Sequence, residues 1–319
     1  MPVMTIIPMP LGRYRACFTF EALPHFSDFP GSAWRGALGH ALKLTVCATH
    51  QPHCSDCLLY GTCVYPYFYD TPPSPDATRM RRYATVPHPY ILDPEGVAKE
   101  SLYRLGFTLI GKANQHLSVF LYALMRAAQG QRGVAGNRFM LADVQQESCP
   151  GGGDWQSIYQ PGGTLTALPP EGAGIPPPPE ACAIEIHTPL RVKRDGRHVD
   201  ARKFGFADLF GNLLRRVSML CAHHTDTPLE IDFRGLMAAA RQVRCEADLT
   251  WRDLARYSAR QKAAMRLGGV VGEIRITGQE LAPFWPYLWL GQWLHGGSGA
   301  TMGLGRYTIT ASLPNPCRD

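Results

Sequence analysis

A glycine-rich stretch near the C-terminus is the first part of the sequence whose residue types and spacing point to chemistry. Residues 296–305 contain five glycines, and Arg306 and the β-prone run 307–310 follow directly. Glycines give up much backbone entropy on ordering, so such a loop suits close approach of a ligand, and its exposed N–H groups could bind phosphates. The expected phosphate contacts are Gly296, Gly297, Gly299, Gly303, Gly305 and Arg306.

The order of elements around this loop decides which phosphate ligand it suits. A dinucleotide fingerprint runs from strand to helix with GxGxxG spacing. Here an apolar, helix-like stretch precedes the loop and a strand follows it, and the glycine spacing differs. A nucleotide cofactor is therefore disfavoured, and a polymeric phosphate backbone is the better candidate.

A histidine beside a lysine supplies the second possibility, which is general acid–base chemistry. On a helical wheel of residues 31–46, one side carries Trp34, Leu38, Ala41 and Thr45. The opposite side carries His40 and Lys43, and the nearby Gly36 and Gly39 would let a polymer backbone approach. This pattern suits proton transfer with charge stabilisation, although a solvated surface histidine has the same pattern.

Two further positions could take part in proton transfer. His295 directly precedes the glycine loop, and its alternative role is that of a helix C-cap histidine favoured by the helix dipole. Tyr257 could relay a proton or stack on a base, and its basic surroundings fit an exposed strand or hairpin equally well. The neighbours expected to contact phosphate are Arg256, Ser258, Arg260 and Lys262.

Two further runs of cations suit contacts to a nucleic-acid backbone. The larger run comprises Arg191, Lys193, Arg194, Arg197, Arg202 and Lys203, and the smaller comprises Arg79, Arg81 and Arg82 beside Tyr83. An isolated run of this kind is more often a solvated face, and an arginine-rich stretch could instead dock a partner subunit. Several runs together with the glycine loop favour binding of nucleic acid.

Four of the ten cysteines form a cluster with metal-ligand character. Cys47, Cys54, Cys57 and Cys63 include a CxxC pair, and four thiolates would complete a tetrahedral zinc site. An iron–sulfur cluster also accepts four thiolates, His50 or His53 could replace a cysteine, and small buried or oxidised thiols remain the alternative. Such a metal would be structural, because a closed site leaves no open position for catalysis.

Composition bounds the class of protein. At 319 residues the chain fits two domains, and its net charge of +6 permits nucleic-acid binding without requiring it. No apolar stretch reaches the roughly 18 residues that a membrane helix needs. We expect no signal peptide, because the first residues lack a basic region and a cleavage site, and clustered cysteines then indicate metal binding in a reducing cytoplasm.

A change of composition divides the chain. Residues 148–180 hold eight prolines and seven glycines, which predicts an interdomain linker that ends semi-rigidly in four prolines. The N-terminal domain would then span 1–147, with a cysteine-rich insertion at 47–85. The C-terminal domain would span 181–319 and contain the glycine loop at 296–305.

Both halves show the element order β-α-β-β-α-β. In the first half we expect strands at 13–20, 103–110 and 138–146, an extended stretch at 87–92, and helices at 31–46 and from 114 to about 129. In the second half we expect strands at 181–187, 243–251, 272–277 and 307–310, and helices at 203–222, 234–241 and 281–294. This order predicts an α+β fold with tandem ferredoxin-like, RRM-like domains, and the linker argues against a single parallel α/β domain.

The tryptophans of the last predicted helix have two explanations. Trp285, Trp289 and Trp293 are four residues apart and could form a stacking platform for bases. Core packing against the second sheet is the better explanation for such a stripe.

The glycine loop before the last strand of a second ferredoxin-like unit resembles the RAMP superfamily of CRISPR RNA-binding proteins. Residues 33–42 look like the first helix of its precursor-crRNA processing endoribonucleases, CRISPR-associated family six. Residues 188–196 look like the start of their second domain, and 256–261 with 267–272 look like the segment before their penultimate helix. The combination of loop, first helix and cysteine cluster is specific to the processing nucleases.

This resemblance implies binding of the CRISPR repeat, often as a hairpin, and metal-independent cleavage at its 3′ side. In such cleavage the 2′-hydroxyl attacks the phosphate, which leaves a 2′,3′-cyclic phosphate and a 5′-hydroxyl. The family often carries its catalytic histidine on the first helix, which favours His40, but it varies these residues between members. The product can stay bound in an effector complex, and a homodimer is compatible with the family.

Two other functions stay open on the sequence. A crRNA-binding subunit of a CRISPR effector that does not cleave would share the fold and the cations. A zinc-stabilised adaptor would use its basic faces to bind protein. His40 and His295 favour the nuclease.

Overall fold

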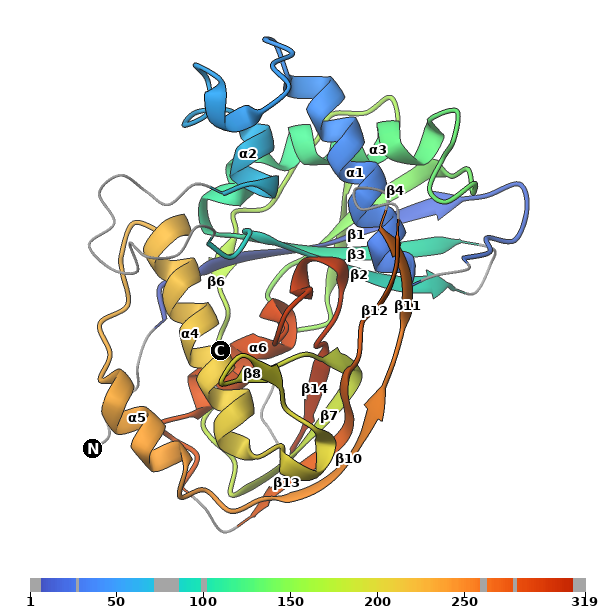
Figure 1. Ribbon diagram of the computed structural model, residues 1–319. Helices are drawn as coiled ribbons and strands as arrows, with labels where there is room; N and C mark the ends of the chain where they lie inside the picture. The colour runs from blue at the N-terminus through green and yellow to red at the C-terminus, as the bar shows by residue number, and fades with distance from the viewer. Residues whose placement is uncertain are drawn as a thin grey trace.

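Two α+β units are stacked one on the other in the fold (Figure 1). The structure is a computed structural model that describes residues 7–26, 29–71, 86–98, 102–258, 263–277 and 280–311, with the side chains of 255–265 left out. Among the described helices, none is both long and apolar enough to cross a membrane.

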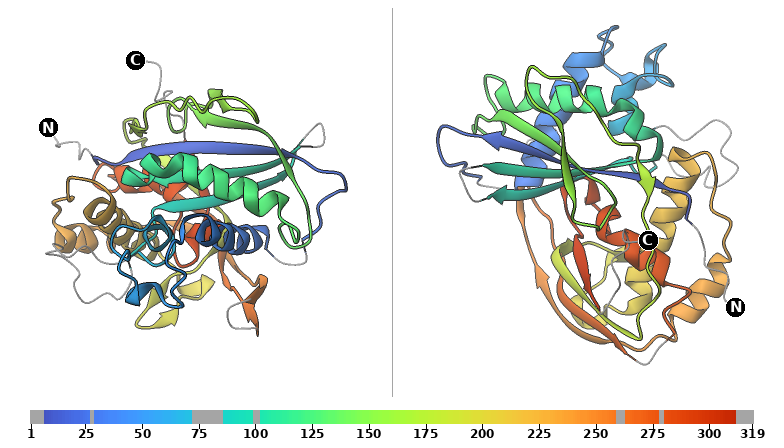
Figure 2. Two further views of the ribbon diagram at one scale, coloured as in Figure 1. Left: turned by 90° about the horizontal axis from the view of Figure 1, so that it is seen from above. Right: turned by 180° about the vertical axis from the view of Figure 1, so that it is seen from behind.

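The first unit is an antiparallel sheet covered on one face by two helices. In chain order its elements are β1 (Pro10–Thr19), α1 (Pro30–Val46), β2 (Tyr90–Val97), β3 (Tyr103–Ile110), α3 (Leu117–Gln129) and β4 (Met140–Glu147). The strand order β2-β3-β1-β4 is that of a ferredoxin-like unit. Helices α1 and α3 lie on the face of the sheet that points away from the second unit (Figures 1 and 2).

The second unit repeats this plan. Its main elements are β7 (Ala181–Leu190), α4 (Phe206–His224), α5 (Phe233–Ala240), β10 (Glu246–Arg252), β13 (Gly269–Thr277), α6 (Trp285–Leu294) and β14 (Tyr307–Thr310). The antiparallel strand order is β10-β13-β7-β14. The predicted tandem of ferredoxin-like units is confirmed. Two short hairpins lie outside the main sheet. The pair β8 (Lys193–Arg194) and β9 (Arg197–His198) was not predicted, and the pair β11 (Ala255–Ser258) and β12 (Ala263–Arg266) is the hairpin offered as one alternative for the stretch around Tyr257.

The segment 148–180 is more than the predicted linker. It adds strand β5 (Trp155–Tyr159) to the edge beside β4, and β6 (Glu171–Gly172) pairs with β1. Farther along, the carbonyl oxygens of Pro176 and Gly174 accept hydrogen bonds from the indole N–H groups of Trp285 and Trp289 at 2.7 and 2.9 Å. Proline and glycine exclude a helix here, but they leave carbonyl groups and edge positions free to pair.

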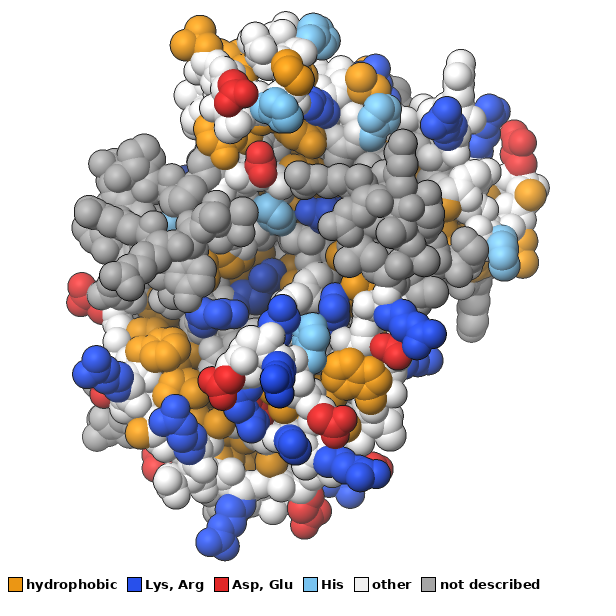
Figure 3. Space-filling model, viewed as in Figure 1, with side chains coloured by type: hydrophobic (Ala, Val, Ile, Leu, Met, Phe, Trp, Pro, Cys, Tyr) orange, Lys and Arg blue, Asp and Glu red, His pale blue; other side chains and the backbone are white. Residues whose placement is uncertain are grey.

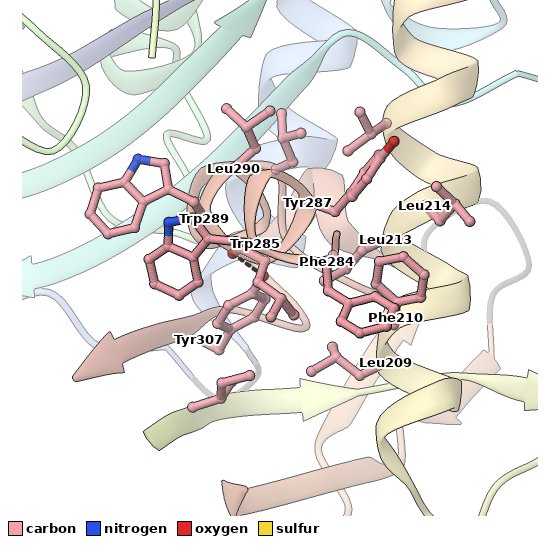
Figure 4. Close-up of a cluster of buried hydrophobic side chains, with 14 of the residues drawn as sticks. Leu209, Phe210, Leu213, Leu214, Phe284, Trp285, Tyr287, Trp289, Leu290 and Tyr307 are labelled. Carbon is pink, nitrogen blue, oxygen red and sulfur yellow. Dashed lines mark hydrogen bonds between the residues drawn. The ribbon is translucent and has the colours of Figure 1, made fainter. Parts of the chain in front are cut away.

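Helix α6 is buried on all sides, so the tryptophans are core residues. Trp285, Trp289 and Trp293 are at most 8% exposed, which confirms the core-packing interpretation. The helix begins at Trp285, later than predicted, and packs between α4 and β14 (Figure 4). Tyr307 of β14 donates a hydrogen bond to the carbonyl oxygen of Leu288 at 2.6 Å. A helix enclosed in this way is apolar around its whole circumference.

The chain after α6 joins the two units. The carbonyl oxygen of Met302 in this loop lies against the first turn of α1, where a Cβ on Gly31 would be only 1.8 Å away. One turn later, Arg35 of α1 donates a hydrogen bond from Nε to Oγ1 of Thr301 at 3.1 Å. The glycine loop therefore fixes α1 of the first unit to the second unit, and Gly31 is needed because no side chain fits beneath the carbonyl.

We expect Gly31→Ala to destabilise the protein while Gly36→Ala does not. The added methyl group at residue 31 overpacks the contact with Met302, which should cost about 1–3 kcal/mol of unfolding free energy. At residue 36 nothing lies within 4 Å of an added Cβ, so alanine should stabilise α1 by up to about 1 kcal/mol. Urea unfolding of both variants measures the difference, and equal stability of the two would refute the role of Gly31.

Candidate functional site

The glycine loop is a packed turn and not an open cradle. Gly296, Gly303 and Gly305 are buried, and only Ser298 is exposed at the tip of the loop. Gly305 has φ +67° and its ideal Cβ would lie 1.9 Å from the carbonyl oxygen of Gly296, so close backbone packing explains its type.

Most main-chain amides of the loop have partners within the chain, and Gly299 is the predicted phosphate-binding glycine for which none is seen in the described part of the chain. Ser298 donates to the carbonyl of Arg191 at 3.0 Å, Gly297 to the side chain of Asn212 at 2.7 Å, and Gly305 to the carbonyl of Pro189 at 3.1 Å. The amides of Gly296, Met302, Gly303 and Leu304 donate to carbonyls within the loop. The prediction that bare amides of this loop bind phosphate is therefore wrong for these positions. The half-buried Gly297 and Gly299 beside Ser298 are the loop glycines that reach the surface.

The face of α1 that carries His40 is open, as the helical wheel predicts. Trp34, Leu38 and Ala41 are buried, and His40 is exposed on the opposite side. Lys43 is half-buried, with its Nζ 5.6 Å from the centre of the Tyr65 ring on the short helix α2 (Val64–Tyr69).

The two glycines on α1 differ from each other. Gly36 is exposed and has free space above it, so a ligand can approach the helix there. Gly39 is covered, because a Cβ at this position would lie 2.6 Å from the ring of Tyr69. The prediction of close approach therefore applies to Gly36 and is wrong for Gly39, which instead accommodates α2.

His295 is enclosed and does not face solvent. It is 2% exposed, caps the C-terminus of α6 with φ +54°, and its Nδ1 has no hydrogen-bond partner. Burial lowers the pKa of His295 to about 4, so the ring is neutral near pH 7. The predicted role of His295 in proton transfer is not supported by this burial, although the residue borders the cleft between the units. The alternative is right that His295 is the C-cap residue of α6 and wrong that it carries a charge.

The stretch around Tyr257 forms a two-stranded hairpin. Arg256, Tyr257 and Ser258 lie on β11, paired with β12, and their side chains are not among those described. Arg260 and Lys262 lie outside the described residues, as do Arg79, Arg81, Arg82 and Tyr83. The hairpin extends from the second unit toward α1 of the first (Figures 1 and 2).

The middle of the larger cation run forms the β8–β9 hairpin, and Arg202 and Lys203 follow on a short 3-10 helix (Ala201–Lys203). Lys193, Arg194 and Arg197 are exposed on it, and Asp195 and Gly196 make the tight turn with positive φ. Lys and Arg side chains gather on the second unit on this face of the molecule, with a hollow toward the first unit (Figure 3).

Two of the predicted phosphate-binding arginines have partners in the protein. Arg194 forms an ion pair with Asp208, in which Nε lies 2.9 Å from Oδ1. Arg191 is half-buried, and its Nε donates to the carbonyl of Gly268 at 3.1 Å. Lys193 and Arg197 have no ion-pair partner among the described residues. These two are therefore the free cations of the hairpin.

A polar cleft lies between the two units, as a tandem of such units predicts, but most of the residues that line it were not among the predicted site residues. It has a volume of about 610 Å³ and is lined from the first unit by Arg13, Arg15 and Trp155, and from the second by His187 and Arg306. The guanidinium carbon of Arg15 lies 3.9 Å from the centre of the Trp155 ring. The alternation of Arg13 and Arg15 with buried Tyr14 and Ala16 on β1 is the signal that could have revealed it.

Each arginine in this cleft is matched by a carboxylate. Nη1 of Arg306 lies 3.1 Å from Oδ1 of Asp93, and Nε of Arg15 lies 2.9 Å from Oε1 of Glu95. Arg13 forms an ion pair with the buried Glu147. His187 is hydrogen-bonded through Nε2 to Oγ1 of Thr308 at 2.7 Å, and burial together with Arg306 lowers its pKa. Arg306, a predicted phosphate contact, is thus paired with Asp93 of the first unit, and the net charge of the cleft is close to zero.

The four clustered cysteines lie around one small cavity. Cys47, Cys54, Cys57 and Cys63 all line a cavity of about 20 Å³ at the end of α1. In the part of the chain that the structure describes, no three His, Cys, Asp or Glu side chains are placed to hold a metal ion as they stand. The grouping of the thiols is as predicted, and the metal stays a prediction.

Buried histidines gather where the units meet. His224 of α4 is fully buried and its Nε2 lies 2.8 Å from the carbonyl oxygen of Pro87 in the first unit. Nδ1 of His88 lies 2.9 Å from Oγ1 of Thr71, within hydrogen-bond distance. Burial lowers the pKa of His88 to about 3 and that of His224 to about 4. Because burial disfavours the charged form of these rings and of His295, their protonation should lower the stability of the folded protein.

Family models match both units of the chain. Residues 184–307 match the model described as CRISPR-associated endoribonuclease Cas6. Residues 9–171 match a model described as an N-terminal domain, AF_1859_N. No curated protein sequence matches the chain.

Solved structures share the fold at low sequence identity. One Cas6 product complex has a TM-score of 0.55 and 14% identity, covering 94% of this chain and 99% of that one. A second Cas6 product complex has a TM-score of 0.50, also at 14% identity, covering 94% of this chain and 99% of that one. A chain of a partial Cas6-RT-Cas1–Cas2 complex has a TM-score of 0.58 at 14% identity and covers 97% of this chain, which spans 47% of that one.

We expect the free energy of unfolding to decrease in acid because of the buried histidines. The unfolded chain binds a proton on each histidine near pH 6.5, whereas folded His224 and His295 do so only near pH 4, so stability falls as the pH falls through this window. Between about pH 7.5 and about pH 5 each of the two should remove about 2 kcal/mol of unfolding free energy.

Urea unfolding across this pH range measures the effect. His224→Gln should flatten the dependence of the unfolding free energy on pH, because it removes one titrating group. His25→Gln, at an exposed position of the first unit, is the matched control and should leave the slope as it is. An unchanged slope in His224→Gln would show that this ring does not link folding to pH.

Proposed function

The chain belongs to the CRISPR-associated endoribonuclease Cas6 family, and on this premise we propose that it binds the repeat of a precursor CRISPR RNA and cleaves it. The family is that of an endoribonuclease, and the fold is that of solved Cas6 product complexes. The open face of α1 carries the proposal further, because it presents an exposed histidine three residues from Lys43 on the same helix.

One face of the molecule supports RNA binding. Seen from above, α1, the β8–β9 hairpin and the β11–β12 hairpin lie on the same side of the first sheet (Figure 2, left). An RNA strand on this side would pass the free cations Lys193 and Arg197 and reach His40 on the first unit. Cations of this kind bind RNA through its phosphates.

The proposed cleavage uses the 2′-hydroxyl of the substrate as nucleophile and needs no metal ion. His40 is the proposed acid–base group, which removes the 2′-hydroxyl proton or protonates the leaving 5′-oxygen. Lys43 is three residues along the same helix and supplies positive charge for the developing phosphorane. Tyr257 on β11 stays a candidate for proton relay or base stacking. The products are a 2′,3′-cyclic phosphate and a 5′-hydroxyl.

His295 is left out of this mechanism. Its side chain borders the cleft between the units, but it is only 2% exposed and it is neutral near pH 7. Its proposed role is to end α6 and set the course of the glycine loop. The amides of that loop are likewise assigned to the joint, and the RNA contacts are assigned to side chains of the hairpins and of α1.

The product is proposed to remain bound within a larger CRISPR assembly. The structural similarity to a chain of a Cas6-RT-Cas1–Cas2 complex supports protein partners for this fold. A crRNA-binding subunit that does not cleave would share this property, and the cleavage assay below separates the two.

We expect His40→Ala to abolish cleavage with little effect on binding. Purified protein is incubated with labelled repeat RNA in the presence of a chelator, and the fragments are tested for a cyclic phosphate. Loss of the acid–base group should slow cleavage by about 10²–10⁴-fold, while the Kd stays within a few-fold. His25→Ala, at an exposed position of the same unit, should cleave normally.

The outcomes of this assay bear on different parts of the proposal. Full activity in His40→Ala would reject this residue as the acid–base group. Binding of the repeat without any cleavage by the wild-type protein would favour the non-cleaving subunit. Absence of both binding and cleavage would contradict the proposed function.

We expect the charges of the β8–β9 hairpin to set the salt dependence of RNA binding. Replacing Lys193 and Arg197 together by glutamine should lower the slope of log K against log salt by about 0.7 for each single-strand phosphate that the variant no longer neutralises. Arg234→Gln, at an exposed site on α5, is the matched control. Equal slopes for the wild type and the double variant would place the RNA elsewhere.

A further inference from the structure

The chain between α1 and α2 has almost no apolar interior. Across residues 47–63 no side chain is buried, and Leu58 is 95% exposed. The side chains of this stretch that are not exposed are Cys47, Cys54, Cys57, Tyr60 and Cys63. Burial on this scale cannot offset the entropy of ordering the backbone. Something other than a hydrophobic core must hold this stretch, and its inward-turning residues are cysteines with a single tyrosine.

The backbone of this stretch turns so that all four cysteines come to the same cavity. The CxxC pair is closed by a hydrogen bond of 3.0 Å from the amide of Cys57 to the carbonyl of Cys54. The amide of Cys63 donates to the carbonyl of Leu59 at 2.8 Å. All four cysteines line the cavity of about 20 Å³, and no Asp or Glu lines it.

One of the thiols already has the surroundings of a thiolate ligand. The sulfur of Cys57 lies 3.4 Å from the amide nitrogen of Leu59, which donates to it, and 3.1 Å from Oγ1 of Thr49. Donors around a ligand sulfur orient it and stabilise its negative charge. His50 and His53 are exposed and do not line the cavity, so the set facing it is four sulfurs.

We propose that Cys47, Cys54, Cys57 and Cys63 bind one structural Zn²⁺ ion. Four thiolates without oxygen ligands fit zinc in a closed tetrahedral site. The thiols are not yet placed to coordinate an ion, so binding must draw them inward, through new side-chain rotamers and movement of this exposed stretch of chain.

The ion would connect two helices that position the candidate catalytic residues. Cys47 caps the C-terminus of α1 and its amide donates to the carbonyl of Lys43 at 3.0 Å. Cys63 is the N-cap of α2, whose Tyr65 ring lies against Lys43. The site would thus hold the end of α1 beyond His40 and Lys43. Only this consequence for activity rests on the proposed function, and the metal site itself does not.

Metal analysis of the purified full-length chain tests the site without RNA. We expect one zinc ion per chain by elemental analysis, bound through four thiolates. A mercurial reagent that titrates thiols should release it, with the released zinc read by a colorimetric chelator. Iron with a visible chromophore, four thiols titrating freely without any metal, or disulfides among these cysteines would each overturn the proposal.

Variants locate the ion. Cys54→Ser with Cys57→Ser should reduce the zinc content at least tenfold and lower the Tm. Cys245→Ser, at a half-buried cysteine of the second unit, should retain the zinc and is the matched control. Should the double variant not fold, Co²⁺ loaded on the wild-type chain replaces it: sulfur-to-cobalt charge-transfer bands with a tetrahedral spectrum support the site, and their absence overturns it.

The activity of the same samples separates this proposal from the proposed function. A closed site should keep its zinc during brief exposure to a chelator, so RNA cleavage and zinc content are measured together. Zinc present without cleavage of repeat RNA counts against the nuclease and leaves the site intact. Cleavage by a chain that holds no metal counts against the site and leaves the nuclease intact.

Discussion

A close approach of backbone to backbone holds the two units of this protein together. The carbonyl of Met302 lies against the first turn of α1, in space that exists only because residue 31 is glycine. The amides of the same loop are hydrogen-bonded to β7 of the second unit and within the loop itself. Helix α1, the interdomain cleft and the buried histidines all take their positions from this joint. The candidate catalytic face is therefore placed by contacts on the opposite side of the same helix.

Much of the fold could be predicted from hydrophobic periodicity. The alternation that predicts β3 at 103–110 and β14 at 307–310 matches their observed bounds, and the repeated β-α-β-β-α-β order is present in both units. Strands β5 and β6 escaped prediction because they pair at sheet edges within a segment rich in proline and glycine. Their pairing depends on the neighbouring strand and not on a pattern of their own. Helix α6 similarly shows no polar face, since its environment comes from both units.

The candidate site was predictable only where it depends on a single element. The exposure of His40 follows from the geometry of one helix, and a helical wheel is sufficient for it. The burial of His295 depends on how the second unit packs against the first, which no local pattern contains. The glycine loop shows the difference most clearly. Its composition indicates a close approach to the backbone, and that is correct, but the approaching group is the chain's own backbone and not a phosphate.

The segment that follows β4 crosses both units and has a mechanical consequence. It adds a strand to the first sheet and then accepts the indole N–H groups of Trp285 and Trp289 from the helix at the centre of the second unit. Hinge motion that separated this segment from the second unit would break these hydrogen bonds, and the indole groups are buried, at 1% and 7% exposure. The molecule should therefore behave as a single stiff body. Discrimination between ligands of different shape would then come from a fixed spacing between surfaces, with little adjustment of that spacing during encounter.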